Sequence, residues 1–192
     1  RKGLLRSANA SSLRLDIPTD DAFLSQIRSV PGVTAAAGRI FFSGMVSTSD
    51  LSGAALLAAI DPMRERAVCP LTAEMVSEGK TLGESVPHSV ILTAELAKRL
   101  GLKLGQSAAI LSNDSDGVLN ALEFRYSGVY GQPGFALRDK MFGFVPLADA
   151  QQLLRMEGRG TEIVVAVENL DDTDKIKPVL QAVVGPAYEV SS

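Results

Sequence analysis

Few residues in this chain have the types and spacing that catalysis requires. His88 is the only histidine and Cys69 the only cysteine. A Ser-His-Asp or Cys-His mechanism would therefore depend on His88 alone as its base. His88 lies between Pro87 and Ser89 in an apparent loop, which is typical of a solvated histidine. Cys69 has apolar neighbours, so we interpret it as a small buried hydrophobic residue.

A second pattern with chemical content is Gly79-Lys80-Thr81, which matches the end of a phosphate-binding loop. That loop requires a further glycine five residues before its last glycine, and position 74 is Glu74. The match is therefore interpreted as a coincidence.

Six carboxylates could supply an acid/base pair or a site for a divalent cation. No two of them have a recognisable spacing, and some have a simpler explanation. Three fall where a helix N-terminus favours negative charge, and the Asp-Pro pair is typical of a turn. We assign no catalytic, cofactor-binding or metal-binding residue to the chain. The carboxylates considered are Asp61, Glu65, Asp139, Asp171, Asp172 and Asp174.

The loop from Gly131 to Gly134 is followed by three large apolar residues, Phe135, Leu137 and Met141. These side chains are expected to be buried under the central part of the molecule. The functional alternative is a tip that contacts a partner, because connections of this kind often carry contacts.

Composition and charge exclude some classes of function. The chain has 192 residues, is 46% hydrophobic and carries a net charge of −3, without a Lys/Arg cluster. Nucleic acid is therefore not an expected partner. No apolar run reaches the roughly 18 to 20 residues that cross a bilayer, and the longest is Ala54 to Ile60. The chain starts at Arg1 without a signal peptide, so we interpret it as a segment of a longer polypeptide.

The elements that would position these residues follow from hydrophobic periodicity. Residues 1–12 have no period and are expected to form an arm. Strands are expected at 13–17, 33–46, 54–60, 107–112, 118–130, 142–145 and 163–167, and helices at 20–30 (capped by Thr19), 72–78 (capped by Thr72), 94–100 (capped by Thr93), 147–154 (followed by Gly158) and 174–184. This order predicts an α+β fold in which two α/β sandwiches built from the ends of the chain flank a more β-rich insert.

Six segments follow one another in a characteristic order. They are 38–65 (GRIFFSG to DPMRE), 78–85 (EGKTLGES), 90–111 (VILTAELAKRLGLKLGQSAAIL), 124–134 (FRYSGVYGQPG), 138–154 (RDKMFGFVPLADAQQLL) and 161–169 (TEIVVAVEN). In this order they resemble the MacB-like periplasmic core domain of FtsX-like, lipoprotein-releasing ABC-transporter permeases. The resemblance covers residues 13–184 and implies a porter-like lobe made of 13–66 and 140–190, with a second lobe, 67–139, inserted between the two halves. Gln106 stands where an acidic residue is common in the family, and 135–140 departs from the usual spacing.

The resemblance also implies a function. In this family the domain lies between the first and second membrane helices of an inner-membrane permease, in the periplasm or extracytoplasmic space, and has no catalytic residues. It couples ATP-driven motion to export or release of a lipoprotein-like or small hydrophobic substrate, while a separate cytoplasmic subunit hydrolyses ATP. A second permease subunit and a periplasmic carrier or adaptor are further implied partners, and no cofactor is implied. The alternatives are a stand-alone periplasmic adaptor that binds protein and an enzyme that uses carboxylates.

Overall fold

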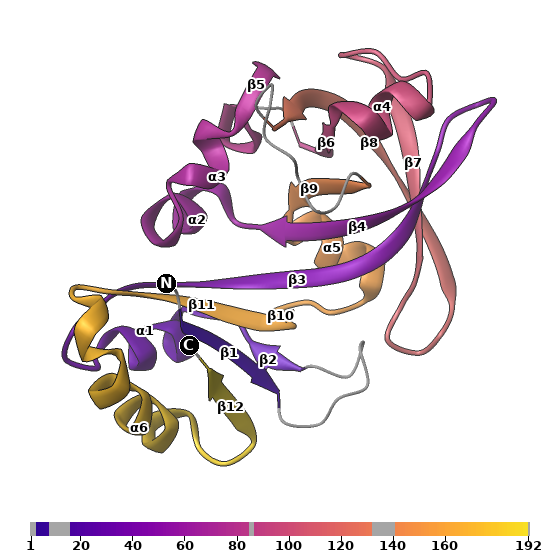
Figure 1. The fold of residues 1–192 in the computed structure, drawn as a ribbon. Helices are drawn as coiled ribbons and strands as arrows, with labels where there is room; N and C mark the ends of the chain where they lie inside the picture. Colours follow the sequence, from indigo (N-terminus) through magenta and orange to yellow (C-terminus); the bar gives the residue numbers. More distant parts are fainter. Residues whose placement is uncertain (1–2, 8–15, 85–86, 132–140, 192) are drawn as a thin grey trace.

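The computed structural model describes residues 3–7, 16–84, 87–131 and 141–191 and has an α+β fold built on one long, twisted sheet (Figure 1). Ten strands form this sheet in the order β12-β1-β11-β3-β4-β9-β6-β8-β5, with β7 paired to both β3 and β8. These strands are β1 (Gly3–Ser7), β3 (Val33–Ser47), β4 (Ser52–Ile60), β5 (Val76–Gly79), β6 (Ser89–Thr93), β7 (Ser107–Asn113), β8 (Leu119–Tyr130), β9 (Phe142–Pro146), β11 (Glu162–Val167) and β12 (Tyr188–Ser191).

Helices cover both faces of the sheet, and a short two-stranded ribbon lies beside it. The ribbon pairs β2 (Ile17–Pro18) with β10 (Arg159–Gly160). The helices are α1 (Asp21–Arg28), α2 (Pro62–Val68), α3 (Leu71–Glu74), α4 (Ala94–Arg99), α5 (Leu147–Leu154) and α6 (Thr173–Val184), with single 3-10 turns η1 (Leu82–Glu84) and η2 (Leu170–Asp172). Of the helices in the described ranges, none has the length and hydropathy needed to cross a bilayer.

Strand β3 runs through the whole molecule and joins its two ends. Its first half pairs with β11, and its second half pairs with β4, so that Arg39 is the residue flanked by both neighbours. Residues 35–38 are buried in succession because the sheet is covered on both faces there. Gly38 allows this close packing, since a Cβ at this position would lie 2.3 Å from Cγ2 of Thr19.

Two large hydrophobic cores lie at either end of β3. The first, which we call the α1–α6 core, includes Leu24 and Ile27 of α1, Ile163 of β11 and Leu180 of α6. Each such side chain contributes roughly 1.5–3 kcal/mol when it is fully buried. The second, the α4–α5 core, is built from one face of β3, β4, β6, β7, β8 and β9 and covered by helices α4 and α5; its buried members include Phe42, Leu57, Leu92, Leu96, Ile110, Phe124, Val145 and Leu154.

The predicted lobe boundaries at 66/67 and 139/140 stay a prediction. The α1–α6 core is built from residues 17–36 and 163–184, which belong to the two predicted halves of the porter-like lobe. The α4–α5 core draws on all three predicted segments, because α5 packs on the strands of the central region. The α+β class itself is confirmed.

Two predicted elements are wrong. Residues 3–7 of the expected arm form strand β1, which pairs with β11 and β12. The helix expected over 72–78 ends at Glu74, and the residues after it form edge strand β5, paired with β8. In both places the local pattern is overruled by pairing with strands that are distant in sequence. The strand expected over 13–17 lies mostly outside the described residues, which resume at Asp16 and include Ile17 in β2.

Helix ends also differ from the prediction. Asp20, and not Thr19, caps α1, because its Oδ1 accepts the N–H of Phe23 at 2.9 Å. Thr93 holds the N-cap position of α4 without a side-chain hydrogen bond to the helix. Helix α5 ends at Leu154, and Arg155 takes the left-handed conformation (φ +53°) directly after it; Gly158, which was expected at the helix end, lies three residues further on and also has a positive φ (+70°).

Candidate functional site

A buried cluster of charges lies where β3 passes from β11 to β4. The Arg39 guanidinium donates from Nε to Oε2 of Glu65 at 2.8 Å and from Nη2 to the other oxygen of the same carboxylate. Thr72 Oγ1 donates to Glu65 Oε1 at 2.9 Å. Glu162 Oε1 lies 3.6 Å from Arg39 Nη1. The side chains of Arg39, Glu65 and Glu162 are only 14%, 3% and 5% exposed, so this ion-pair network is largely buried.

Local sequence signals explain how these residues meet. Arg39 and Glu162 are directly opposed in the β3–β11 register. Asp61 caps α2 by accepting the N–H groups of Met63 and Arg64, and Pro62 takes the first helical position. Glu65 then lies one turn into α2 and faces the sheet. The network therefore ties a helix and two strands to one guanidinium.

The electrostatics of the network keep Arg39 charged. Burial lowers the pKa of Arg39, but the hydrogen bond and charge of Glu65, together with the charge of Glu162, outweigh it, so the pKa is raised above its ordinary value. A guanidinium that stays protonated transfers no proton, but it provides a fixed, bidentate contact. The network therefore holds α2 and β11 to β3 through fixed contacts with Arg39.

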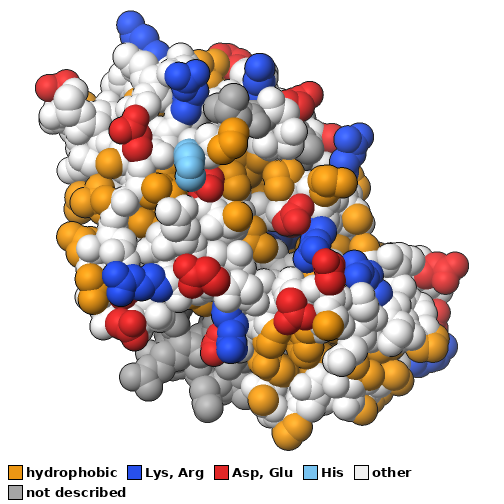
Figure 2. All heavy atoms as spheres, turned by 180° about the vertical axis from the view of Figure 1, so that it is seen from behind, with side chains coloured by type: hydrophobic (Ala, Val, Ile, Leu, Met, Phe, Trp, Pro, Cys, Tyr) orange, Lys and Arg blue, Asp and Glu red, His pale blue; other side chains and the backbone are white. Residues whose placement is uncertain are grey.

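A second charged contact joins the start of β6 to α5. Nδ1 of His88 lies 3.1 Å from Oδ1 of Asp149, and the backbone N–H of His88 donates to Oδ2 at 3.2 Å. Burial raises the pKa of the Asp149 carboxyl, although His88 opposes this shift. The imidazole is 47% exposed and is visible on the surface as the pale blue group in Figure 2. The interpretation of His88 as a solvated loop residue is therefore incomplete, because Asp149 holds one edge of the ring.

His88 also has a positive φ of +56°, which is uncommon for a residue other than glycine. The bidentate contact with Asp149 and the edge-on contact of its ring with Phe124 hold this conformation. The neighbouring Ser89 hydroxyl is buried and has no hydrogen-bond partner among the described residues. The Ser89 hydroxyl is therefore enclosed by the protein and does not face solvent beside His88.

Three of the remaining carboxylate candidates lie next to one another before α6 and in its first turn. Asp171 and Asp172 are in η2, and Asp174 is in the first turn of α6. Asp172 accepts a hydrogen bond from Lys175. Asp139 and the loop residues 132–140 lie outside the described residues. Within the described ranges, no group of three His, Cys, Asp or Glu side chains is placed to hold a metal ion.

The phosphate-loop fragment and the cysteine have ordinary structural positions. Gly79 ends the edge strand β5 with a φ of +81°, and Thr81 precedes the single 3-10 turn η1, where it donates to Glu84 from both its N–H and its Oγ1. Cys69 is half-buried at the end of α2 and packs against the residues of α2, β3 and β11 that include Val68 and Ala37.

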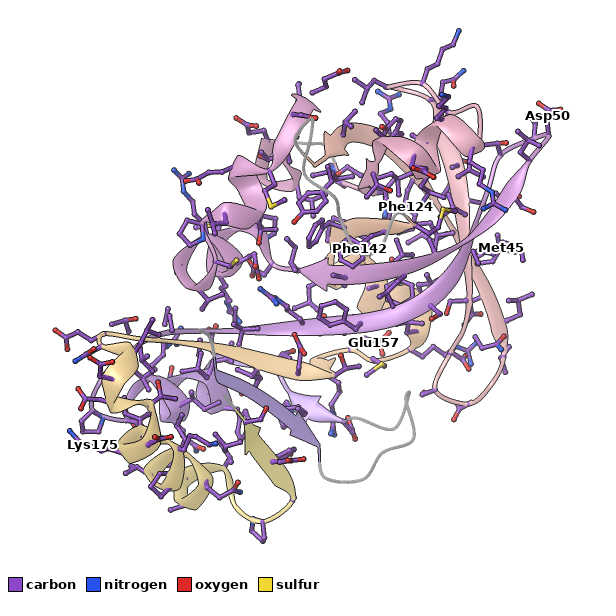
Figure 3. The ribbon with its side chains drawn as sticks, in the orientation of Figure 1. Met45, Asp50, Phe124, Phe142, Glu157 and Lys175 are labelled. Carbon is purple, nitrogen blue, oxygen red and sulfur yellow. The ribbon has the colours of Figure 1, made fainter. Side chains whose placement is uncertain are left out.

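The structure also contains an exposed surface that the sequence patterns did not indicate. The β3–β4 hairpin extends beyond the rest of the sheet, and Figure 3 shows Met45 and Asp50 along and at the end of it. Met45 and Leu51 are 48% and 49% exposed, and Leu104, in the turn before β7, is also exposed. The sequence signal was the polar turn at 47–52, which follows directly after Met45 and Val46. This hairpin is the candidate surface for contact with another protein.

Comparison with known proteins identifies the fold. No family model matches the chain. Among solved structures, the extracellular domain of the noncanonic ABC-type transporter YknZ from Gram-positive bacteria is similar, with a TM-score of 0.68, 15% identity and 100% coverage of both chains. The periplasmic region of MacB from Actinobacillus actinomycetemcomitans is similar with a TM-score of 0.67 and 12% identity, over 100% of this chain and 88% of that one.

A more distant similarity is to a domain of a protein described as a permease from Porphyromonas gingivalis, with a TM-score of 0.52 and 13% identity over 99% of this chain and 86% of the other. At such low identities the similarity concerns the fold. The chain thus has the α+β fold of the extracytoplasmic domains of the YknZ and MacB transporters, over its full length.

Proposed function

We propose that this chain is the extracytoplasmic domain of an ABC-transporter permease. The observation that carries this proposal is the similarity to the YknZ and MacB domains, which extends over the whole chain and is not limited to one lobe. A fold alone does not imply a function. The ordered motifs at 38–65 and 90–111 support the same assignment independently, because they were recognised from the sequence without the fold.

In this proposal the domain carries out no reaction of its own and transmits motion between membrane helices and a partner outside the membrane. ATP is hydrolysed by a separate cytoplasmic subunit. Coupling requires that ATP and the transported substrate favour different arrangements of the protein, because a ligand shifts an equilibrium only by its differential affinity. Strand β3 is suited to transmit such a change because both ends of the domain share it. The ion pair of Arg39 with Glu65 holds the middle of this strand against α2.

The finer assignment is an inner-membrane permease of the FtsX-like, lipoprotein-releasing type, with this domain in the periplasm. It rests on the resemblance of 13–184 to that family. Its substrate would be lipoprotein-like or a small hydrophobic molecule, and its partners an ABC ATPase, a second permease subunit and a periplasmic carrier or adaptor. The exposed β3–β4 hairpin, with Met45 and Leu51, is the surface that we assign to the carrier or adaptor.

Co-purification tests the assignment. The full-length parent protein, tagged and extracted from membranes in detergent, is expected to bring down the ATPase encoded beside it. Replacing Leu51 and Met45 by serine should leave the ATPase bound, because these residues lie in the hairpin and not at the membrane. Recovery of the parent protein in the soluble fraction, with no ATPase bound, would contradict the proposal.

A further inference from the structure

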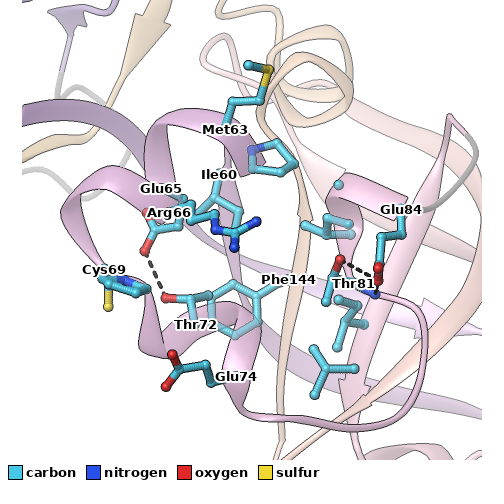
Figure 4. A pocket seen from close by; sticks show the side chains of 16 residues that line it. Ile60, Met63, Glu65, Arg66, Cys69, Thr72, Glu74, Thr81, Glu84 and Phe144 are labelled. Carbon is cyan, nitrogen blue, oxygen red and sulfur yellow. Dashed lines mark hydrogen bonds between the residues drawn. The ribbon is translucent and has the colours of Figure 1, made fainter.

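A pocket of about 490 Å³ opens between α2, α3 and η1, on the face of the sheet opposite the α4–α5 core (Figure 4). Its floor is apolar and consists of Ile60 of β4, Leu82 of η1, Ile91 of β6 and Phe144 of β9. This volume falls within the range of pockets that bind small molecules, roughly 300–1,000 Å³. The floor is rigid, because the ring of Phe144 packs edge-on against Tyr130 and Phe142.

The polar groups around the pocket differ in whether they already have hydrogen-bond partners. Glu65 accepts from Arg39 and Thr72. Glu84 accepts twice from Thr81, and these bonds lower the pKa of the Glu84 carboxyl. Both carboxylates therefore already accept hydrogen bonds from neighbouring side chains.

Arg66 is the exception among these charged groups. It lines the pocket from α2, and Figure 4 shows its guanidinium above the ring of Phe144, with Glu84 on the other side of the pocket. Within the described part of the chain, no hydrogen bond or ion pair occupies its donors. A guanidinium offers five N–H donors in a planar fork that fits a carboxylate or phosphate. Lys80 adds positive charge nearby, since it acts on Glu84 together with Arg66.

We propose that this pocket binds an amphiphilic anion, whose carboxylate or phosphate head pairs with Arg66 while its apolar group covers Phe144 and Leu82. A medium-chain fatty carboxylate is the simplest member of this class. Glu74 and Glu84 repel such an anion, but bidentate, charge-assisted hydrogen bonds are about twice as strong as neutral ones. Glu74 and Glu84 therefore lower the affinity of the pocket for anions, and Arg66 determines which head group binds.

Titration of the 192-residue chain with octanoate, followed by ¹H–¹⁵N NMR, tests the proposal. Octanoate is expected to shift the amide signals of Leu82, Gly83 and Glu84 saturably. 1-Octanol, which has the same chain length but no charge, should bind about tenfold more weakly, because it cannot form the charge-assisted hydrogen bonds of a carboxylate with Arg66. Binding that is equal for both amphiphiles, or shifts that avoid the pocket, would overturn the proposal.

Two arginines on α2 provide a matched pair of variants. Arg66→Gln should weaken octanoate binding about tenfold. Arg64→Gln should leave it unchanged, because Arg64 lies outside the pocket and pairs with Asp21. Glu74→Gln should tighten binding by removing a repulsive charge. If Arg66→Gln and Arg64→Gln behave alike, Arg66 does not hold the head group and the proposal is wrong.

A fourth variant tests the apolar part of the pocket. Gly83 lies on its rim with room for a side chain, since a Cβ there would meet only Pro62 at 3.5 Å. Gly83→Trp is therefore expected to fold normally and to abolish octanoate binding by filling the pocket. Unchanged binding in this folded variant would overturn the proposal. These measurements do not depend on the transport function, which co-purification of the full-length protein tests separately.

Discussion

The Arg39–Glu65 contact and the His88–Asp149 contact both attach a helix to the sheet through a carboxylate, but they differ in burial. The first is almost fully enclosed, is bidentate, and has a further carboxylate beside it. The second is half open to solvent, since the His88 side chain is 47% exposed. The comparison indicates that the buried Arg39 contact holds α2 more strongly than the half-exposed His88 contact holds α5.

The largest expected effect is the loss of the buried contact. Arg39→Met leaves Glu65 and Glu162 buried without their cation, so the free energy of unfolding should fall by about 3–5 kcal/mol. Urea denaturation followed by circular dichroism measures this change. Arg64→Met removes an arginine whose partner Asp21 is exposed, and it should cost no more than about 1 kcal/mol. Equal losses for the two variants would show that burial does not separate these ion pairs.

The half-exposed contact should contribute less. Asp149→Ala removes the acceptor for both the backbone N–H and the ring of His88, and we expect a loss of about 1–3 kcal/mol in the free energy of unfolding. The same denaturation experiment measures it. A loss as large as that of Arg39→Met would remove the distinction between the two contacts.

Backbone strain at His88 should make a smaller contribution to the free energy of unfolding. His88→Ala and His88→Gly both remove the ring, but only glycine adopts a positive φ without cost. The glycine variant should therefore be more stable than the alanine variant by about 1 kcal/mol. If alanine is equally stable, the loop changes conformation once the ring is absent, and Asp149 does not hold a strained backbone.

Two carboxylates should respond to acid in opposite directions. Asp149 has a pKa that burial raises above 3.8, so the folded protein binds this proton more tightly than the unfolded chain does. Its contribution to stability therefore increases as pH falls through the raised pKa towards 3.8. Thermal unfolding of wild type and Asp149→Asn between pH 3 and pH 7 should show wild type gaining relative to the variant in this window.

Asp114, in the β7–β8 loop, provides the opposite case. Burial raises its pKa, but hydrogen bonds from the N–H groups of Val118 and Asp116 and from Asn120 outweigh burial, so the pKa is lowered. Its stabilising contribution is complete above 3.8 and is lost as pH falls through the lowered pKa. The advantage of wild type over Asp114→Asn should therefore shrink in acid. The same direction of change for both carboxylates would refute this assignment.

Local patterns in the sequence were sufficient to predict elements whose stabilising residues lie close together in the chain. The α1 helix follows from Leu24 and Ile27 on one face, and the β7–β8 hairpin follows from the polar turn at 113–117. Strand β1 and strand β5 could not be recognised, because their pairing partners β11, β12 and β8 are distant in sequence. Residues 72–79 even have the cap and terminal glycine of a helix, which shows that local signals can favour a structure that tertiary pairing replaces.

The charged contacts were beyond sequence reasoning for the same reason. Arg39 and Glu65 are separated by the whole β3–β4 hairpin, and Asp149 is 61 residues from His88. Glu65 was considered only as a catalytic or metal-binding carboxylate, and Asp149 was not considered. Arg39 and Glu65 do, however, stand at the start and the end of the first motif that resembles the permease family, 38–65. The segment 38–65 therefore contains both partners of the ion pair, although the pair forms only when α2 packs on the sheet.

The central claim is that this domain lies outside the cell membrane as part of a permease, and site-directed labelling tests it directly. Ser49, exposed at the end of the β3–β4 hairpin, is replaced by cysteine in a full-length protein that carries Cys69→Ser. A maleimide that cannot cross the inner membrane should label this cysteine in cells whose inner membrane is intact, and cell lysis should not increase the labelling. Labelling that occurs only after lysis would place the hairpin in the cytoplasm and contradict the account.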